Sequence, residues 1–217
     1  MNNYISLYGT VISLPKQASV DKNGKIHYGF YLATERPSGF SDVVRVVVKE
    51  DTEAFRQLVA IDQMGDLFAK KLLIRGEVHT RSYRISGKNK VEISVRALKI
   101  LDQEWDAESN VAIIRGHVCK IKPIRETPRG LKIVDVILAC QREKGSVSDY
   151  IPVIAWNGMA VRMAERLKVG DAIEVRGRLQ SRVYEKMFED GTREDRVCYE
   201  LSVESYSERP SENRKMK

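Results

Sequence analysis

Residues 150–156 read Tyr-Ile-Pro-Val-Ile-Ala-Trp, and residues 176–184 read Arg-Gly-Arg-Leu-Gln-Ser-Arg-Val-Tyr. Side chains alternate between the two faces of a strand, and this period predicts a β-strand for both stretches. In the first stretch one face is apolar and suits a core, while Tyr150 and Trp156 lie at the two ends of the opposite face. The second stretch places on a single face the side chains of Arg176, Arg178, Gln180, Arg182 and Tyr184.

Rings interleaved with arginines suit the binding of single-stranded nucleic acid. Aromatic side chains stack on unpaired bases, and cations follow the phosphates. The same residues also have simpler explanations. Aromatic residues are favoured in strands generally, and the arginines could form a solvated face paired with Glu174 or Glu185. The two stretches by themselves leave both interpretations open.

The charge of the chain favours an anionic partner. Its 217 residues carry a formal net charge of +7. Residues 1–108 hold 16 Lys and Arg against 14 Asp and Glu, whereas residues 109–217 hold 21 against 16. A basic balance attracts polyanions such as nucleic acid, so the second half is the better candidate for binding one.

Catalysis, a cofactor and a membrane have no support in the sequence. The common nucleotide-binding, zinc-protease and serine-hydrolase motifs are absent. Cys119, Cys140 and Cys198 are widely spaced and are expected to be reduced thiols. No apolar run reaches the length of a membrane span, and the first residues do not resemble a signal peptide. We therefore expect a cytoplasmic protein that is not an enzyme and needs no cofactor or metal.

The two halves of the sequence repeat one order of elements, which indicates two copies of one domain. Each half has three strands, a short helix, and two further strands that form a hairpin. The predicted strands are residues 4–14, 25–34, 42–49, 71–83 and 90–101, and then 111–121, 131–141, 149–156, 172–184 and 196–206. This is the order of the OB-fold, a five-stranded, partly open Greek-key barrel. The predicted fold class is all-β, with two tandem OB-folds that each carry a short helix between strands three and four.

The repeat also predicts the domain boundaries. We expect a first OB-fold over residues 1–101, an acidic linker over 102–109, a second OB-fold over 110–206 and a polar tail over 207–217. Local matches set Gly9 over Gly116, Arg75-Gly76 over Arg176-Gly177, residues 28–33 over 134–139, residues 81–83 over 182–184 and residues 92–95 over 200–203.

Residues 110–206 resemble the bacterial single-stranded DNA-binding proteins. The residues that carry the resemblance include Asn110-Val111, Arg115-Gly116, Pro123, Arg125-Glu126-Thr127, Leu138-Ala139, Asp149 to Val153, Trp156, Leu167 to Gly170, and Glu174 to Arg182. These matches cover nearly all of the second predicted domain. The first domain resembles the family only in outline.

The resemblance implies sequence-tolerant binding of single strands by assemblies of four OB domains. A chain with two such domains would reach four as a homodimer. The implied stacking rings are Tyr150, Trp156 and Tyr184, and the phosphate contacts are Arg176, Arg178, Arg182, Arg142 and Lys144. Family members usually end in an acidic tip that recruits replication and repair enzymes. This chain ends in the basic stretch 212–217, so that role is not carried over.

The first half departs from the binding pattern of the second. Val43 stands where the second half has Tyr150, Lys49 where it has Trp156, and Glu77 where it has Arg178. Only the ring of Tyr83 is kept, with Arg81 two residues before it. We expect the first domain to bind single strands weakly, or to serve in dimerisation or spacing.

The sequence therefore predicts a protein that binds and protects single-stranded DNA in replication, recombination or repair. Two alternatives keep the fold. The chain could be a primosomal or recombination accessory that mainly docks replication or recombination proteins, or it could be an RNA-binding OB module.

Overall fold

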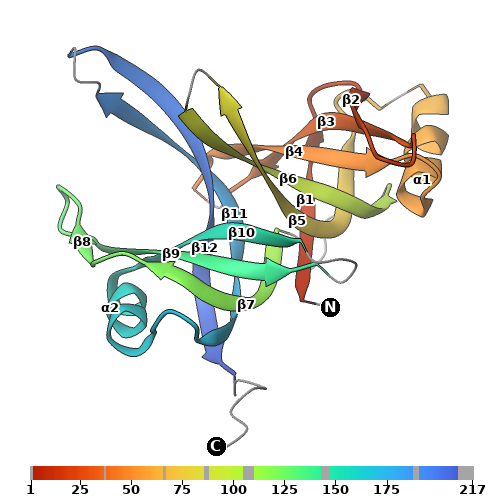
Figure 1. Cartoon of the computed structure of the whole chain (residues 1–217). Helices are drawn as coiled ribbons and strands as arrows, with labels where there is room; N and C mark the ends of the chain where they lie inside the picture. Colours follow the sequence, from red (N-terminus) through yellow and green to blue (C-terminus); the bar gives the residue numbers. More distant parts are fainter. Residues whose placement is uncertain are drawn as a thin grey trace, which may run out of the picture. The chain divides into compact units, whose positions relative to one another are not determined.

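The computed structural model describes residues 2–36, 38–65, 67–85, 88–104, 110–142, 147–187 and 191–209 (Figure 1). These residues form twelve strands and two helices. The elements of the first half are β1 (Asn3–Val11), β2 (Lys16–Val20), β3 (Ile26–Glu35), β4 (Ser41–Lys49), α1 (Glu53–Gln63), β5 (Lys71–Ile85) and β6 (Lys88–Leu101). Those of the second half are β7 (Val111–Ile121), β8 (Arg125–Glu126), β9 (Lys132–Gln141), β10 (Ser148–Trp156), α2 (Asn157–Arg166), β11 (Ala172–Met187) and β12 (Arg193–Glu208).

The chain divides into two compact units. The first unit comprises Met1–Ile114 and Gln141–Asp149, and the second comprises Arg115–Cys140 and Tyr150–Lys217. The start of β7 falls in the first unit, where it pairs with β1 from Asn3↔Ile114 to Ser6↔Val111. The predicted domain boundaries stay predictions, since residues 105–109 of the expected linker lie outside the described residues.

The first unit is a closed barrel. Its strands follow the order β2-β3-β4-β6-β5-β1, and β1 returns to β3 at Thr10↔Ala33. The pairing of β4 with β6 is parallel, at Val46↔Val95. Thr52 caps α1 by accepting a hydrogen bond from the backbone N–H of Phe55. The helix buries Ala54, Leu58 and Ile61.

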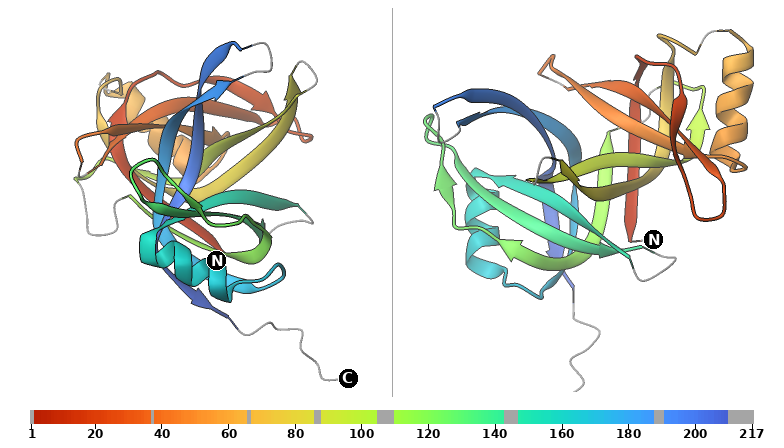
Figure 2. Two further views of the ribbon diagram at one scale, coloured as in Figure 1. Left: turned by 90° about the vertical axis from the view of Figure 1, so that its left-hand side faces the viewer. Right: turned by 45° about the horizontal axis from the view of Figure 1, so that its top comes forward.

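The second unit has the same topology. Its order is β7-β11-β12-β10-β9-β8, with closure of β7 on β9 at His117↔Ala139 and a parallel pair between β10 and β12 at Val153↔Leu201 (Figure 2). The helix α2 follows β10, as α1 follows β4, and buries Ala160 and Met163. Both units are therefore OB-folds, and the predicted fold class is confirmed.

The prediction missed two short strands, β2 and β8. Every residue of Lys16–Val20 is at least partly exposed, so β2 has no buried face and no apolar alternation that could reveal it. The two-residue strand Arg125–Glu126 is exposed throughout. Each pairs only with the strand that follows it, β3 or β9, and forms an arm beside the barrel.

A close approach of two backbones explains why the Arg-Gly pair of both halves contains glycine. A Cβ on Gly76 would lie 2.1 Å from the carbonyl oxygen of Arg96, and a Cβ on Gly177 would lie 2.0 Å from that of Ser202. Both glycines sit at a register shift in the long hairpin, opposite Ala97 and Val203. The backbones approach too closely there for any side chain.

The strand registers correct one of the local matches. Because Gly76 faces Ala97 and Gly177 faces Val203, residue 97 is equivalent to residue 203. Glu92 is then equivalent to Cys198 and not to Glu200, a difference of two residues. The charged side chains on these last strands therefore occupy different places in the two barrels.

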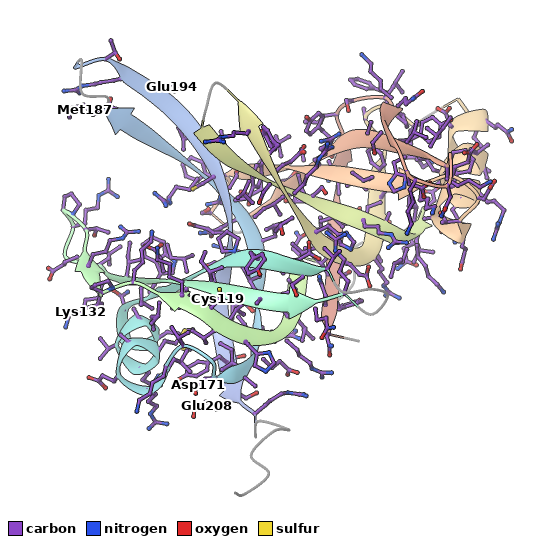
Figure 3. All side chains as sticks on the ribbon, in the orientation of Figure 1. Cys119, Lys132, Asp171, Met187, Glu194 and Glu208 are labelled. Carbon is purple, nitrogen blue, oxygen red and sulfur yellow. The ribbon has the colours of Figure 1, made fainter. Side chains whose placement is uncertain are left out.

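The hairpin of β11 and β12 is long. It pairs continuously from Ile173↔Glu208 to Met187↔Arg193. Met187 and Glu194 lie toward its outer end, and Asp171 and Glu208 lie at the opposite end (Figure 3). Neither helix of the described residues is long and apolar enough to cross a bilayer.

Candidate nucleic-acid interface

A basic groove of about 460 Å³ lies on the second unit, on the face of the barrel formed by β9 and β10 and flanked by the β11–β12 hairpin. Its cations are Lys120, Lys122, Arg125 and Arg182, and its carboxylates are Asp135 and Glu200. The equivalent face of other OB-folds, with its flanking loops, binds oligonucleotides and oligosaccharides.

The groove has more cations than carboxylates to pair them. Arg125 and Lys122 share Asp135, with N–O distances of 3.2 and 3.7 Å. Arg182 Nε lies 3.3 Å from Glu200 Oε1. Burial by itself would lower the pKa of Arg182, and the hydrogen bond to Glu200 reverses this, so the pKa lies above its usual value. The lining is therefore cationic, with carboxylates that hold the guanidinium groups in place.

Tyr150 stands beside this groove as an exposed ring. It lies on β10 with 52% of its surface exposed, two residues from Pro152, which lines the groove. Trp156 ends β10, is half-buried, and occupies the position before α2. Ile154 between them is fully buried, although alternation assigns it to the same face. The two predicted rings are thus separated by a residue of the core.

The predicted arginines of β11 differ in their surroundings. Arg176 is exposed and Arg178 is half-buried, whereas Gln180 is buried and donates a hydrogen bond to Glu200 at 3.3 Å. Arg182 shares that carboxylate. Glu174 pairs with Arg115 and Arg209.

Two predicted residues, Tyr184 and Lys144, lie partly or wholly outside the described part of the chain. The backbone of Tyr184 pairs with Arg196 in the hairpin, but its side chain lies outside the part that the structure describes. Lys144 lies outside it entirely.

Arg142, which follows β9, is bonded to the start of β10. Its Nε and Nη2 each lie 2.7 Å from the carboxylate of Asp149, which is fully buried. Its backbone N–H also donates to the carbonyl of Val147 at 3.1 Å. Burial would raise the pKa of Asp149, but the hydrogen bonds from Arg142 and from the backbone N–H of Thr80 overcome this and hold it below its usual value. The carboxylate is thus ionised and the guanidinium is engaged by it.

The same arrangement follows β3, the strand whose place in the fold is equivalent to that of β9. Arg36 Nε lies 2.7 Å from Asp42 Oδ2, and the Arg36 N–H donates to the carbonyl of Phe40 at 2.7 Å. Asp42 is buried like Asp149, and both are the second residue of their strand. We call each bonded pair an Arg–Asp clamp. The guanidinium of Arg142 thus has a structural partner in Asp149, and its contact with phosphate stays a prediction.

The first unit has a groove of about 350 Å³ in the equivalent place, lined by residues of β2 to β6, by Asp21 and by Arg142. Arg81 is one of its lining residues and is exposed, and Tyr83, which is 37% exposed, lies two residues further along β5. The described lining residues include no Phe, Tyr or Trp.

Sequence reasoning missed Lys120, Lys122 and Arg125 as groove residues. Lys120 is the last residue but one of β7 and Lys122 follows the strand directly, so period two already placed them on one face. The short strand that carries Arg125 had no detectable pattern. Within the described residues, no three His, Cys, Asp or Glu side chains gather to ligate a metal ion.

Comparison with known proteins agrees with this geometry. The model of the Single-strand binding protein family matches residues 109–207. The matched stretch is the second half of the chain, where the sequence carries its resemblance to this family. The resemblance seen in the sequence is thereby confirmed.

Relatives match the same part of the chain. The single-stranded DNA-binding protein of Clostridium tetani is 32% identical over 89 residues, which are 39% of this chain and 60% of that protein. The single-stranded DNA-binding protein of Bacillus cereus is 35% identical over 89 residues, which are 39% of this chain and 51% of that protein. The chain thus spans about half to three fifths of these relatives.

A solved structure matches the whole chain. The single-stranded DNA-binding protein from Thermus aquaticus superposes with a TM-score of 0.70 and 22% identity, covering 99% of this chain and 96% of that one. This likeness extends the fold assignment to both units.

Proposed function

We propose that the chain binds single-stranded DNA with little sequence preference and protects it during replication, recombination or repair. The second unit is the main binding site in this proposal. The observation that carries it is the exposed ring of Tyr150 beside a cationic groove, within the segment that matches the single-strand binding protein family.

Bases would stack on Tyr150, Trp156 and Tyr184. Stacking of this kind contributes on the order of 1–3 kcal/mol per base and tolerates any base. Phosphates would contact Arg176, Arg178 and Arg182, together with the groove cations Lys120, Lys122 and Arg125. The phosphate contribution should fall steeply with salt, because each neutralised phosphate releases counterions.

The proposal includes assembly and location. A chain with two OB-folds would present four of them as a homodimer, as the family resemblance implies. The protein would act by sequestration, without catalysis. Its three cysteines are thiols, which supports a reducing compartment, the cytoplasm. Light scattering with and without oligo-dT gives the mass of the assembly and the DNA stoichiometry together.

The central test is Trp156→Ala in the full chain, titrated with oligo-dT and with a mixed-sequence strand by fluorescence anisotropy. We expect affinity to fall about tenfold or more for both strands, with the salt slope nearly unchanged. Ile12→Ala, at an exposed apolar residue of the first unit, is the control. Unchanged affinity of Trp156→Ala would reject the stacking assignment. Preference for tRNA over oligo-dT in a competition would favour an RNA-binding module instead.

A further inference from the structure

The groove of the first unit is rich in cations and lacks stacking rings. Arg45 and Lys49 enter it from β4, Arg81 from β5 and Arg96 from β6. Arg81 is equivalent to Arg182 of the second unit, so the two grooves share a cation at this place. With no Phe, Tyr or Trp among its described lining residues, such a groove suits phosphodiester backbone and not bases.

Three of these cations have a carboxylate within ion-pair distance. Arg45 Nη1 donates to Glu92 Oε1 across the groove, from β4 to β6. Lys49 Nζ lies 2.6 Å from Asp21 Oδ2, which reaches in from the turn between β2 and β3. Arg96 Nη1 lies 3.9 Å from Glu77. The hydrogen bonds from the Lys49 side chain and from the backbone N–H groups of Lys25 and Asn23 hold the pKa of Asp21 far below its usual range.

The second unit lacks the two closest of these pairs. The strand registers make Arg45 equivalent to Pro152 and Glu92 equivalent to Cys198, so the pair across the groove has no counterpart there. Lys49 is equivalent to Trp156. Arg45, Glu92 and Lys49 of the first groove thus occupy positions where the second unit has the uncharged side chains of Pro152, Cys198 and Trp156.

We propose that the groove of the first unit is a latent phosphodiester-binding site, in which Asp21 and Glu92 act as internal counterions to Lys49 and Arg45. This inference rests on the proposed function for its ligand class. A phosphate can contact these cations only by displacing a carboxylate that already holds them. No counterions are then released from the paired cations, so this groove adds little to binding by the native chain. Removal of the two carboxylates frees both cations for phosphates.

The test is the double variant Asp21→Asn, Glu92→Gln in the full chain. Asn keeps the Oδ1 acceptor that Asp21 offers to the N–H groups of Asn23 and Lys25, at 2.9 and 3.0 Å, so the turn is preserved. The probes are oligo-dT and an abasic deoxyribose-phosphate strand of the same length. The matched control is Glu35→Gln, Asp62→Asn, which removes two exposed carboxylates outside the groove.

We expect the double variant to bind the abasic strand about tenfold more tightly than the native chain at low salt. Its log–log salt slope should steepen by about 1.4, since each phosphate contact on a single strand contributes about 0.7. The single variant Asp21→Asn should give about half of that change, and it serves if the loss of Glu92 impairs folding.

Equal tightening by the control would mean that net charge alone acts, and would overturn the proposal. So would a salt slope that stays at the native value. Failure of the native chain to bind oligo-dT, together with tight binding by the double variant, would reject the proposed function and leave the latent site standing.

Discussion

The strands β4 and β10 are the same element in two barrels, and they differ in a regular way. Both have nine residues, both begin with Ser and a buried Asp, and both pair in parallel with the last strand of their unit. The outward positions diverged, from Val43 to Tyr150, from Arg45 to Pro152 and from Lys49 to Trp156. The two strands agree in character at the positions that form the core, that approach another backbone closely or that belong to the Arg–Asp clamp. The comparison separates what the barrel requires from what a binding face requires.

The largest effect should come from the glycines that both barrels require. Gly76→Ala or Gly177→Ala sets a Cβ about 2 Å from a carbonyl oxygen, so the hairpin must shift. We expect each to lower the free energy of unfolding by about 3 kcal/mol in urea titrations. Gly158→Ala, whose Cβ would meet nothing within 4 Å, should be neutral or slightly stabilising. A large effect in one unit only would contradict the equivalence of the two hairpins.

The Arg–Asp clamps should give the next largest effect. Asp149→Asn or Asp42→Asn leaves a partly buried guanidinium without its charge partner, and should cost about 2 kcal/mol, less than a fully buried pair. The native pKa of Asp149 lies below its unfolded value near 3.9, so its contribution is complete above that pH and is lost as pH falls further. Acid titration of stability in native chain and variant measures this. Arg142→Ala should lower stability by a similar amount and leave the DNA salt slope unchanged, and a reduced slope would restore Arg142 as a phosphate contact.

Reciprocal exchange on β4 and β10 should change DNA affinity and not the fold. Tyr150→Val removes an exposed ring, and we expect a loss of about 1–2 kcal/mol in binding oligo-dT. Val43→Tyr places a ring on the first unit, where the neighbouring cations are paired, and should add less than half of that. Anisotropy titrations of both variants decide the matter. Equal and opposite effects would mean that the two faces differ only in their rings.

The smallest effect should come from single half-buried charges, Arg178 and Glu77. Arg178→Ala should reduce the salt slope by about 0.7 and leave the unfolding free energy within about 0.5 kcal/mol. Glu77→Gln in the first unit, which removes the carboxylate beside His79 and Arg96, is the companion measurement. An unchanged slope for Arg178→Ala would remove that residue from the phosphate contacts.

The sequence was sufficient for the architecture and insufficient for the site. Ten strands and both helices could be located from strand periodicity, from Gly9 and Gly116, and from the Arg-Gly pairs. Alternation of core residues and close approach of two backbones are both visible in a single sequence. The pairing of side chains across strands produces no such pattern in the sequence. Nothing in the sequence links Arg45 to Glu92 or Arg182 to Glu200, and the two-residue register difference between Glu92 and Cys198 appears only when β5–β6 and β11–β12 are paired.

The Arg–Asp clamp has a consequence for how such a chain can change. Six positions separate Arg36 from Asp42, and seven separate Arg142 from Asp149, yet the same side-chain and backbone bonds fix both ends. The segment between the two residues can therefore gain or lose an amino acid without altering the strands on either side. The segment is therefore a suitable site for engineering. A loop could be transferred from one barrel to the other, or a label inserted, while the anchoring bonds remain in place.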